Sequence, residues 1–244
     1  MDPDYYRLVA AVEDEHWWYV ARRRILSRVL LNLRLAAGAR ILDAGCGTGG
    51  NLQMLSQHGR VSAFEMEPYS REVAAGKRFG EVLTGSLPDD IPFDAATFDV
   101  VTALDVIEHI ENDAGALRAI RGLLVPGGTL ILTVPAYQFL WSSHDEVNHH
   151  CRRYTLSGVT DTLRKAGFDT VHATYFNTWL FPAIAATRLV GRVLPRSGQR
   201  SDLRLPPRIV NRLLTVVFGS EAWITSTHTL PFGVSILVVA RPRP

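Results

Sequence analysis

The spacing of hydrophobic positions along this chain differs before and after residue 37. Apolar residues recur every three or four positions across residues 1–36, which predicts helix there. Beyond that point, short apolar runs typical of buried strands alternate with stretches of helical period. We expect strands at 40–43, 60–66, 81–86, 98–106, 129–136, 169–176 and 233–241, and helices at 68–78, 111–124 and 156–166.

This alternation indicates an α/β fold with a seven-stranded, mainly parallel sheet and helices on both of its faces. We divide the chain into four parts. They are an N-terminal helical cap (1–36), an α/β core (37–177), a helical insertion (178–231) and the last strand of the core (232–244). The whole length of 244 residues suits one large domain with an insertion.

The insertion differs from the rest of the chain in charge. It holds seven arginines, one at every fourth residue from 188 to 212, and two acids, so its net charge is +5 and the remainder carries −3. Pro195, Pro206 and Pro207 exclude one continuous helix, and the apolar spacing predicts two amphipathic helices. Three roles remain open: a lid, a homodimer contact, or docking to an anionic membrane surface or a phosphorylated lipid.

Composition points to a reducing compartment. The chain has two cysteines, Cys46 and Cys151, and Cys46 lies inside a glycine-rich turn that a disulfide would distort. No basic segment precedes an apolar core at the N-terminus, and the longest apolar stretch (179–186) is too short to span a bilayer. We therefore expect a cytoplasmic protein.

The chemistry of the chain centres on residues 40–51, RILDAGCGTGGN. Bare glycines after a buried strand let backbone N–H groups and the following helix N-terminus approach a ligand. Read as Gly45-x-Gly47-x-x-Gly50, the turn fits a dinucleotide site. Asp43 favours another ligand, because its carboxylate would repel a pyrophosphate but attract the amine and sulfonium of S-adenosylmethionine.

Read as Asp43-x-Gly45-x-Gly47-x-Gly49, the same turn resembles motif I of the class I S-adenosylmethionine-dependent methyltransferases. Glu65 follows 22 residues after Asp43, where the family has the acid that binds both ribose hydroxyls. Three further blocks match in order. Residues 85–88 correspond to the adenine loop, with Ser86 in place of the usual acid, while 98–110 and 123–135 resemble blocks of the ubiquinone- and menaquinone-biosynthesis type.

The resemblance implies a Rossmann-like sheet whose seventh strand inserts antiparallel beside the sixth, and S-adenosylmethionine as cofactor. With Arg22, which we add because it lies beside Trp17 and Trp18 just ahead of the glycine turn, we expect a cofactor site of Arg22, Asp43, Gly45, Cys46, Gly47, Gly49, Asn51, Glu65, Met66, Ser86, Leu87, Leu104, Asp105 and His109. The N-terminal part of this site is open to two interpretations. Arg22 or Arg23 binds the cofactor's carboxylate, or both arginines only extend from an amphipathic helix to water. Glu108 and His109 have a second interpretation as caps of a helix beginning near Glu111.

A second chemical stretch, WSSHDEVNHHCRRYT at 141–155, resembles an Asp-x4-His-x-Arg-Arg-Tyr block of a bacterial subgroup of these enzymes. Its histidines and cysteine, at 144, 149, 150 and 151, have no regular metal-ligand spacing, so we expect no metal. A structural role would pair Asp145 with Arg152 or Arg153. A catalytic role would make His150 a general base oriented by Asp145, with His144 as second candidate.

These patterns predict methyl transfer to an oxygen or nitrogen of a small-molecule or lipid-like acceptor. Two other functions fit the same fold: cofactor-dependent chemistry without methyl transfer, such as a cyclase or decarboxylase, and a binding module without activity. Nucleic acid is not expected as a partner. The chain outside the insertion is acidic, and no base-flipping motif follows the fourth strand.

Overall fold

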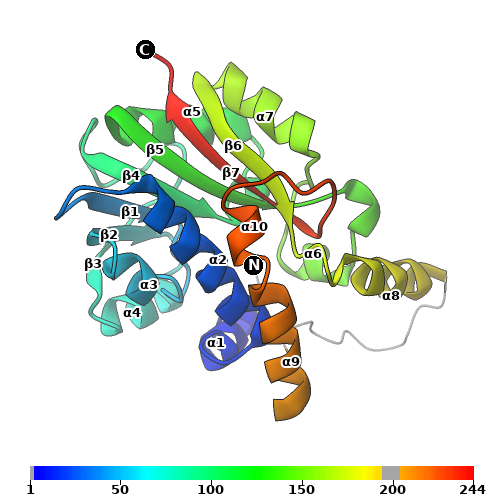
Figure 1. Cartoon of the computed structure of the whole chain (residues 1–244). Helices are drawn as coiled ribbons and strands as arrows, with labels where there is room; N and C mark the ends of the chain where they lie inside the picture. The colour runs from blue at the N-terminus through cyan, green and yellow to red at the C-terminus, as the bar shows by residue number, and fades with distance from the viewer. Residues whose placement is uncertain (1–2, 194–203) are drawn as a thin grey trace.

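The computed structural model describes residues 3–193 and 204–244, which fold around one twisted sheet (Figure 1). The seven strands are ordered β3-β2-β1-β4-β5-β7-β6. β7 is antiparallel to its neighbours β5 and β6, and the other pairs are parallel, as the sequence predicts. Their bounds are β1 Arg40–Ala44, β2 Arg60–Glu65, β3 Gly80–Thr84, β4 Phe98–Leu104, β5 Leu124–Pro135, β6 Phe168–Phe176 and β7 Ser235–Pro242.

The register of the central strands positions the site. Asp43 on β1 lies between Ala63 of β2 and Thr102 of β4. Because these strands are parallel, their carboxyl ends meet at one edge, where open α/β sheets bind ligands. β1 and β4 are buried on both faces, which explains why each reads as a continuous apolar run.

Two layers of helices cover the sheet. One face is covered by α2 (Trp17–Leu33), α3 (Leu52–Ser56) and α4 (Pro68–Gly76), and the other by α5 (Asp113–Leu123) and α7 (Leu156–Lys165). Each apolar side chain buried in these layers contributes roughly 1.5–3 kcal/mol. The side chain of Asn112 caps α5 by accepting from Gly115 N, so the interpretation of Glu108 and His109 as caps is wrong. Those two residues instead form a short 3₁₀ helix, η1 (Ile107–His109).

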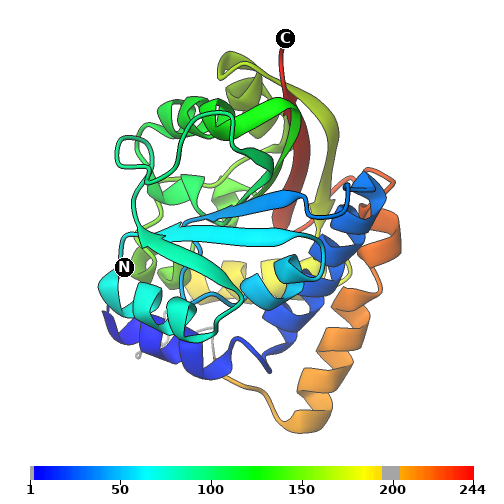
Figure 2. The same cartoon turned by 90° about the vertical axis from the view of Figure 1, so that its left-hand side faces the viewer.

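The predicted N-terminal helical region consists of two helices. α1 (Pro3–Val12) ends before Glu13, and α2 begins after His16, whose ring accepts from Trp18 N. Figure 2 shows α1 lying beneath α4. The buried Glu13 joins them, since its carboxylate accepts from Thr48 Oγ1 (2.8 Å) and from Lys77 Nζ (2.6 Å).

The insertion contains the two expected helices, α8 (Phe181–Val193) and α9 (Arg208–Gly219), followed by the short α10 (Ala222–Thr225). α9 lies along α2, where the ring of Phe218 meets Trp17 and Phe176. Of the predicted arginine series, positions 196 and 200 fall outside the described residues, as does Pro195. Every helix in the described part of the chain is too short or too polar to cross a lipid bilayer.

Candidate functional site

The glycine turn follows β1 and is tied to β2 by its backbone. Gly45 N and Cys46 N both donate to Phe64 O, at 3.0 and 3.1 Å. Gly47 has φ +55°, and a Cβ placed there would meet no atom within 4 Å, so its backbone faces open space. Gly49 serves packing instead, because a Cβ there would approach Ala74 to 3.0 Å. The turn therefore presents bare backbone to a ligand at Gly47.

Asp43 lies under this turn with one carboxylate oxygen satisfied and one not. Thr102 Oγ1 donates to its Oδ1 (2.6 Å), and its Oδ2 has no hydrogen-bond partner among the described residues. Burial raises the pKa of this carboxyl to about 6, although the Thr102 hydrogen bond and Arg22 oppose that rise. The unsatisfied oxygen is a position where a ligand cation would be stabilised.

Glu65 ends β2 facing the turn, and two backbone groups orient its side chain. Gly47 N donates to its Oε2 (2.8 Å) and Glu67 N donates to its Oε1 (2.9 Å). Each carboxylate oxygen can accept a second hydrogen bond. Glu65 can therefore receive two hydroxyl groups, as the predicted ribose contact requires.

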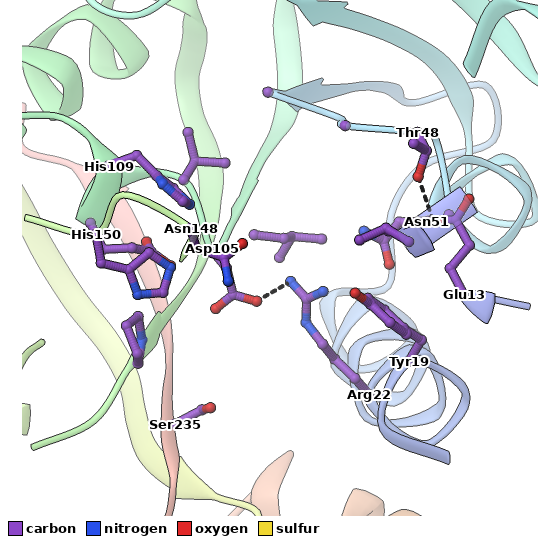
Figure 3. Close-up of a pocket in the computed structure, with 18 of the residues that line it drawn as sticks. Glu13, Tyr19, Arg22, Thr48, Asn51, Asp105, His109, Asn148, His150 and Ser235 are labelled. Carbon is purple, nitrogen blue, oxygen red and sulfur yellow. Dashed lines mark hydrogen bonds and ion pairs between the residues drawn. The ribbon is translucent and has the colours of Figure 1, made fainter. Parts of the chain in front are cut away.

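The two candidate arginines of α2 point to different places. Arg22 is buried, forms an ion pair with Asp105 (2.8 Å) and donates to Thr133 Oγ1 (3.1 Å) inside the cavity (Figure 3). Its guanidinium lies over the Trp18 ring, 4.9 Å from the centroid. Arg23 donates to the backbone carbonyls of Glu13 and Gly50. Only Arg22 remains a candidate for the cofactor's carboxylate.

These groups line one cavity of about 830 Å³, in the range of small-molecule sites. All the predicted cofactor and catalytic residues line it except Gly49 and Asp145, and Met66 and Ser86 are among those that do. Sequence reasoning missed several further lining residues. Most come from segments far apart in the chain, whereas Thr48, Glu108 and Asn148 lie inside the motifs but are not among the residues that the motifs assign. The missed residues include Tyr5, Tyr6, Trp17, Trp18, Thr48, Glu108, Asn148, Asn177, Ile184, Thr187, Arg188, Val234 and Ser235.

At the other end of the cavity, His150 is held by the buried Asp145. The Asp145 carboxylate accepts from Arg153 Nε (2.8 Å) and Nη2 (3.0 Å) and from Ser142 N (2.8 Å). Although burial opposes it, these donors and His150 hold the pKa of Asp145 well below its usual range. An ionised Asp145 only accepts, so His150 donates from Nδ1 (2.8 Å), and a neutral His150 ring would have its lone pair at Nε2.

The contacts of Asp145 are compatible with both interpretations of the block at 141–155. Asp145 orients His150, as the catalytic interpretation requires, and pairs with Arg153, as the structural interpretation requires. Arg152 pairs with Asp113 instead (2.9 Å). Residues 143–147 form a short helix, α6 (Ser143–Val147), which the sequence does not predict.

Two residues of η1 meet His150. The rings of His109 and His150 are in edge contact, with centroids 4.6 Å apart. Burial and the nearby His150 lower the pKa of His109 to about 4, so its ring is neutral. Glu108 is fully buried, and burial and Asp105 raise its pKa well above the usual range. Figure 3 shows His109 and His150 across the cavity from Thr48 and Asn51, with Arg22 and Asp105 between.

S-adenosylmethionine fits the donor set on the turn side. Asp43 offers an unsatisfied carboxylate oxygen toward its cationic amino end, Gly47 an open backbone, and Glu65 two acceptors for ribose hydroxyls. Arg22 lies on the same wall with its charge toward Asp105. Together with strand order β3-β2-β1-β4-β5-β7-β6, this site defines the class I S-adenosylmethionine-binding α/β proteins.

Comparison with known proteins gives the family. Residues 17–173, more than half of the chain, match the methyltransferase domain family, and the chain belongs to this family, whose cofactor is S-adenosylmethionine. Over 114 residues it is 38% identical to a ubiquinone biosynthesis O-methyltransferase of Methylocella silvestris. That alignment covers 42% of this chain and 44% of the relative, so the chain spans less than half the length of this curated relative.

Solved structures share the fold at low identity. A TehB-like S-adenosylmethionine-dependent methyltransferase from Corynebacterium glutamicum superposes with a TM-score of 0.55 at 17% identity, covering 89% of this chain and 87% of that one. The [4+2]-cyclase SpnF gives a TM-score of 0.58 at 19% identity, covering 90% and 81%. At these identities the similarity establishes the fold alone.

Proposed function

We propose that this protein transfers the methyl group of S-adenosylmethionine to an oxygen or nitrogen of a small-molecule or lipid-like acceptor in the cytoplasm. One observation carries the proposal: a single cavity runs from the cofactor edge at Asp43 and Glu65 to the polar group around His150. An acceptor in the second half would face the methyl group in the first. The similarity to a protein named for ubiquinone O-methylation supports a small organic acceptor.

The reaction needs little beyond orientation and proton removal. The sulfonium makes the methyl group a good electrophile, so the protein must align the acceptor, exclude water and accept one proton. His150 is the proposed proton acceptor, because Asp145 fixes its Nδ1 and leaves Nε2 toward the cavity. His144 is second, since its ring also lines the cavity, 6.1 Å from that of His150.

The test is transfer of labelled methyl from S-adenosylmethionine to a panel of phenols, catechols, amines and quinol lipids. We expect label in the acceptor and one demethylated cofactor per product. His150→Ala should lower turnover about 10²–10⁴-fold with little change in cofactor affinity. Glu146→Ala, an exposed position on α6, is the matched control.

Two results would overturn parts of this proposal. A product formed without labelled methyl would assign the protein to the non-transferring enzymes, for which the fold similarity to the cyclase SpnF is a precedent. If His150→Ala turns over normally and His144→Ala does not, His144 is the proton acceptor.

For the insertion we propose peripheral contact with an anionic lipid surface. Ile209, Leu213 and Val216 share one face of α9 and are 85%, 60% and 55% exposed. Arg208 and Arg212 are exposed on the same helix, so apolar and basic groups are presented together. α8, the other long helix of the insertion, contributes Ile184, Thr187 and Arg188 to the cavity wall.

Sedimentation with phospholipid vesicles tests the contact. Binding should be stronger to vesicles with anionic lipid than to neutral ones and should weaken with salt. Replacing Ile209, Leu213 and Val216 by serine should abolish it, whereas Arg164→Gln on the distant helix α7 should not. If the wild type ignores vesicles but is a dimer in solution that the serine variant dissociates, the surface is a homodimer contact.

A further inference from the structure

Glu108, His109 and His150 form a compact group of potential metal ligands beside the cofactor edge. One ligand atom from each lies within 4.8 Å of the others. Glu108 and His109 come from η1 after β4, and His150 comes from the loop after α6. The group differs from the histidine and cysteine run at 144–151, whose irregular spacing led us to expect no metal.

Glu108 supplies the independent observation. Its side chain is fully buried, and both carboxylate oxygens have no hydrogen-bond partner among the described residues. Burying a carboxylate without partners costs several kcal/mol, so a buried acid is paired, binds a metal or keeps its proton, and the raised pKa of Glu108 corresponds to the last of these when no metal is bound. The neighbouring cation, Arg22, is used by Asp105. A bound cation would therefore take the place of the proton on Glu108.

The rings of His109 and His150 are oriented by hydrogen bonds, as the rings of metal-binding histidines usually are. Metal-binding histidines usually donate their second ring N–H to a carboxylate or a backbone carbonyl, which fixes the ring. His150 donates from Nδ1 to Asp145, which Arg153 anchors in turn. The His109 ring forms a hydrogen bond with the Asn148 backbone.

We propose that Glu108, His109 and His150 bind a divalent cation of the first-row transition series, such as Mn²⁺ or Zn²⁺. Bonds of about 2.0–2.2 Å place ligand atoms up to about 4.4 Å apart, so a small contraction of the group suffices. Two imidazoles and one carboxylate suit these ions better than Mg²⁺ or Ca²⁺, which prefer all-oxygen sites. Three protein ligands leave coordination positions open toward the cavity.

This inference rests on the proposed function and deepens it. An acceptor oxygen bound to the cation would lose its proton to solvent more readily, because a divalent ion lowers the pKa of a coordinated hydroxyl. Nε2 of His150 cannot hold a cation and accept a proton at once. In the metal-bound protein, His150 therefore acts through the cation, and its role as a base belongs to the metal-free protein.

Calorimetric titration of the chelator-treated full chain with Mn²⁺ and with Zn²⁺, without cofactor or acceptor, tests the site directly. We expect one ion per chain. Glu108→Gln and His109→Ala should weaken binding at least ~10-fold, no less than the loss of a group that orients a ligand. His144→Ala, which alters a cavity histidine outside the group, should bind the ion as the wild type does. Absence of binding, or equal loss in His144→Ala, would overturn the site.

Unfolding temperatures distinguish a metal-ligand role of Glu108 from a purely structural role. Glu108→Gln removes an unpaired buried carboxyl while keeping its shape, so the metal-free variant should unfold no lower than the metal-free wild type. The ion should raise the unfolding temperature of the wild type and not of this variant. A marked drop for metal-free Glu108→Gln would instead assign Glu108 to structure.

Activity distinguishes the two proposals from each other. Metal binding without methyl transfer to any acceptor would leave the site standing and overturn the function. Methyl transfer that chelation leaves unchanged, in protein that binds no ion, would leave the function standing and overturn the site.

Discussion

The protonation state of Asp43 affects both the stability of the fold and the binding of a cationic ligand. With its pKa raised by burial to about 6, the folded protein keeps a proton that an unfolded chain, with an ordinary value of 3.8, has already released. Its contribution to stability therefore falls as pH rises from about 4 to about 6 and is constant above that range. Binding of a cationic cofactor has the opposite dependence, because it favours the carboxylate.

We therefore predict that S-adenosylmethionine affinity falls as pH drops below about 6, approaching tenfold per pH unit. Calorimetry between pH 5 and 7.5 measures it. Asp43→Asn should bind more weakly at pH 7.5 and show no such dependence, since its amide does not titrate. A wild-type affinity that is constant over this range would show that Asp43 does not face the cofactor's charge.

Glu65 permits a second prediction at the same scale. Glu65→Ala removes two acceptors for ribose hydroxyls and the partner of Gly47 N, so cofactor binding should weaken by about 1.5–3 kcal/mol. Glu72→Ala, an exposed acid on α4, should bind normally. Unchanged affinity of Glu65→Ala, or tight binding of a nicotinamide dinucleotide by the wild type, would contradict the assignment.

Among the described helices, α1 has no extensive contact with the sheet, so we expect its removal to leave the sheet closed. Its neighbours are α4 and the cavity, to which it contributes Tyr5, Tyr6 and Val9. A deletion extending to residue 24 would also remove Ala21 and Arg22, which are buried residues of α2 itself. The N-terminal cap thus contains one dispensable helix and one core helix.

Deleting residues 1–12 should accordingly leave far-UV circular dichroism unchanged outside the lost helix and weaken S-adenosylmethionine binding roughly tenfold, through lost apolar contact area. Fluorescence or calorimetric titration of the truncated chain checks this. Normal affinity would mean that α1 only covers the surface, and loss of the native spectrum would mean that Glu13 and its partners do not suffice to order the turn.

Predictability from sequence differed between elements for a physical reason. Asp43, Gly47 and Glu65 lie within 23 residues on adjacent parallel strands, so local pattern alone indicated where they would meet. Glu108 looked like a helix cap, because His150, which lies near it in the fold, follows 42 residues later and approaches it only through the topology of the sheet. Asn177 and Ser235, at facing ends of β6 and β7, carry no motif that announces a cavity.

At the scale of the whole molecule, the cavity depends on segments from nearly the entire length of the chain. The cofactor half uses α1, α2 and the ends of β1 and β2, and the acceptor half uses η1, the loop after β5, α8 and the start of β7. A cofactor that bridges these parts binds only when all are in place. The catalytic site therefore forms only when the sheet is complete.

The position of β7 has a consequence for how the protein is made. Among the described strands, β6 pairs with β7 alone, and β7 also occupies the edge of β5. A ribosome releases β5 and β6 before β7, so during synthesis the emerging chain has an unpaired β5 edge and a β6 without a neighbour. Such edges promote aggregation of incomplete chains. The nascent protein therefore depends on β7 to close the sheet, and methyl-transfer capacity should arise in one step, after Ser235–Pro242 has left the exit tunnel.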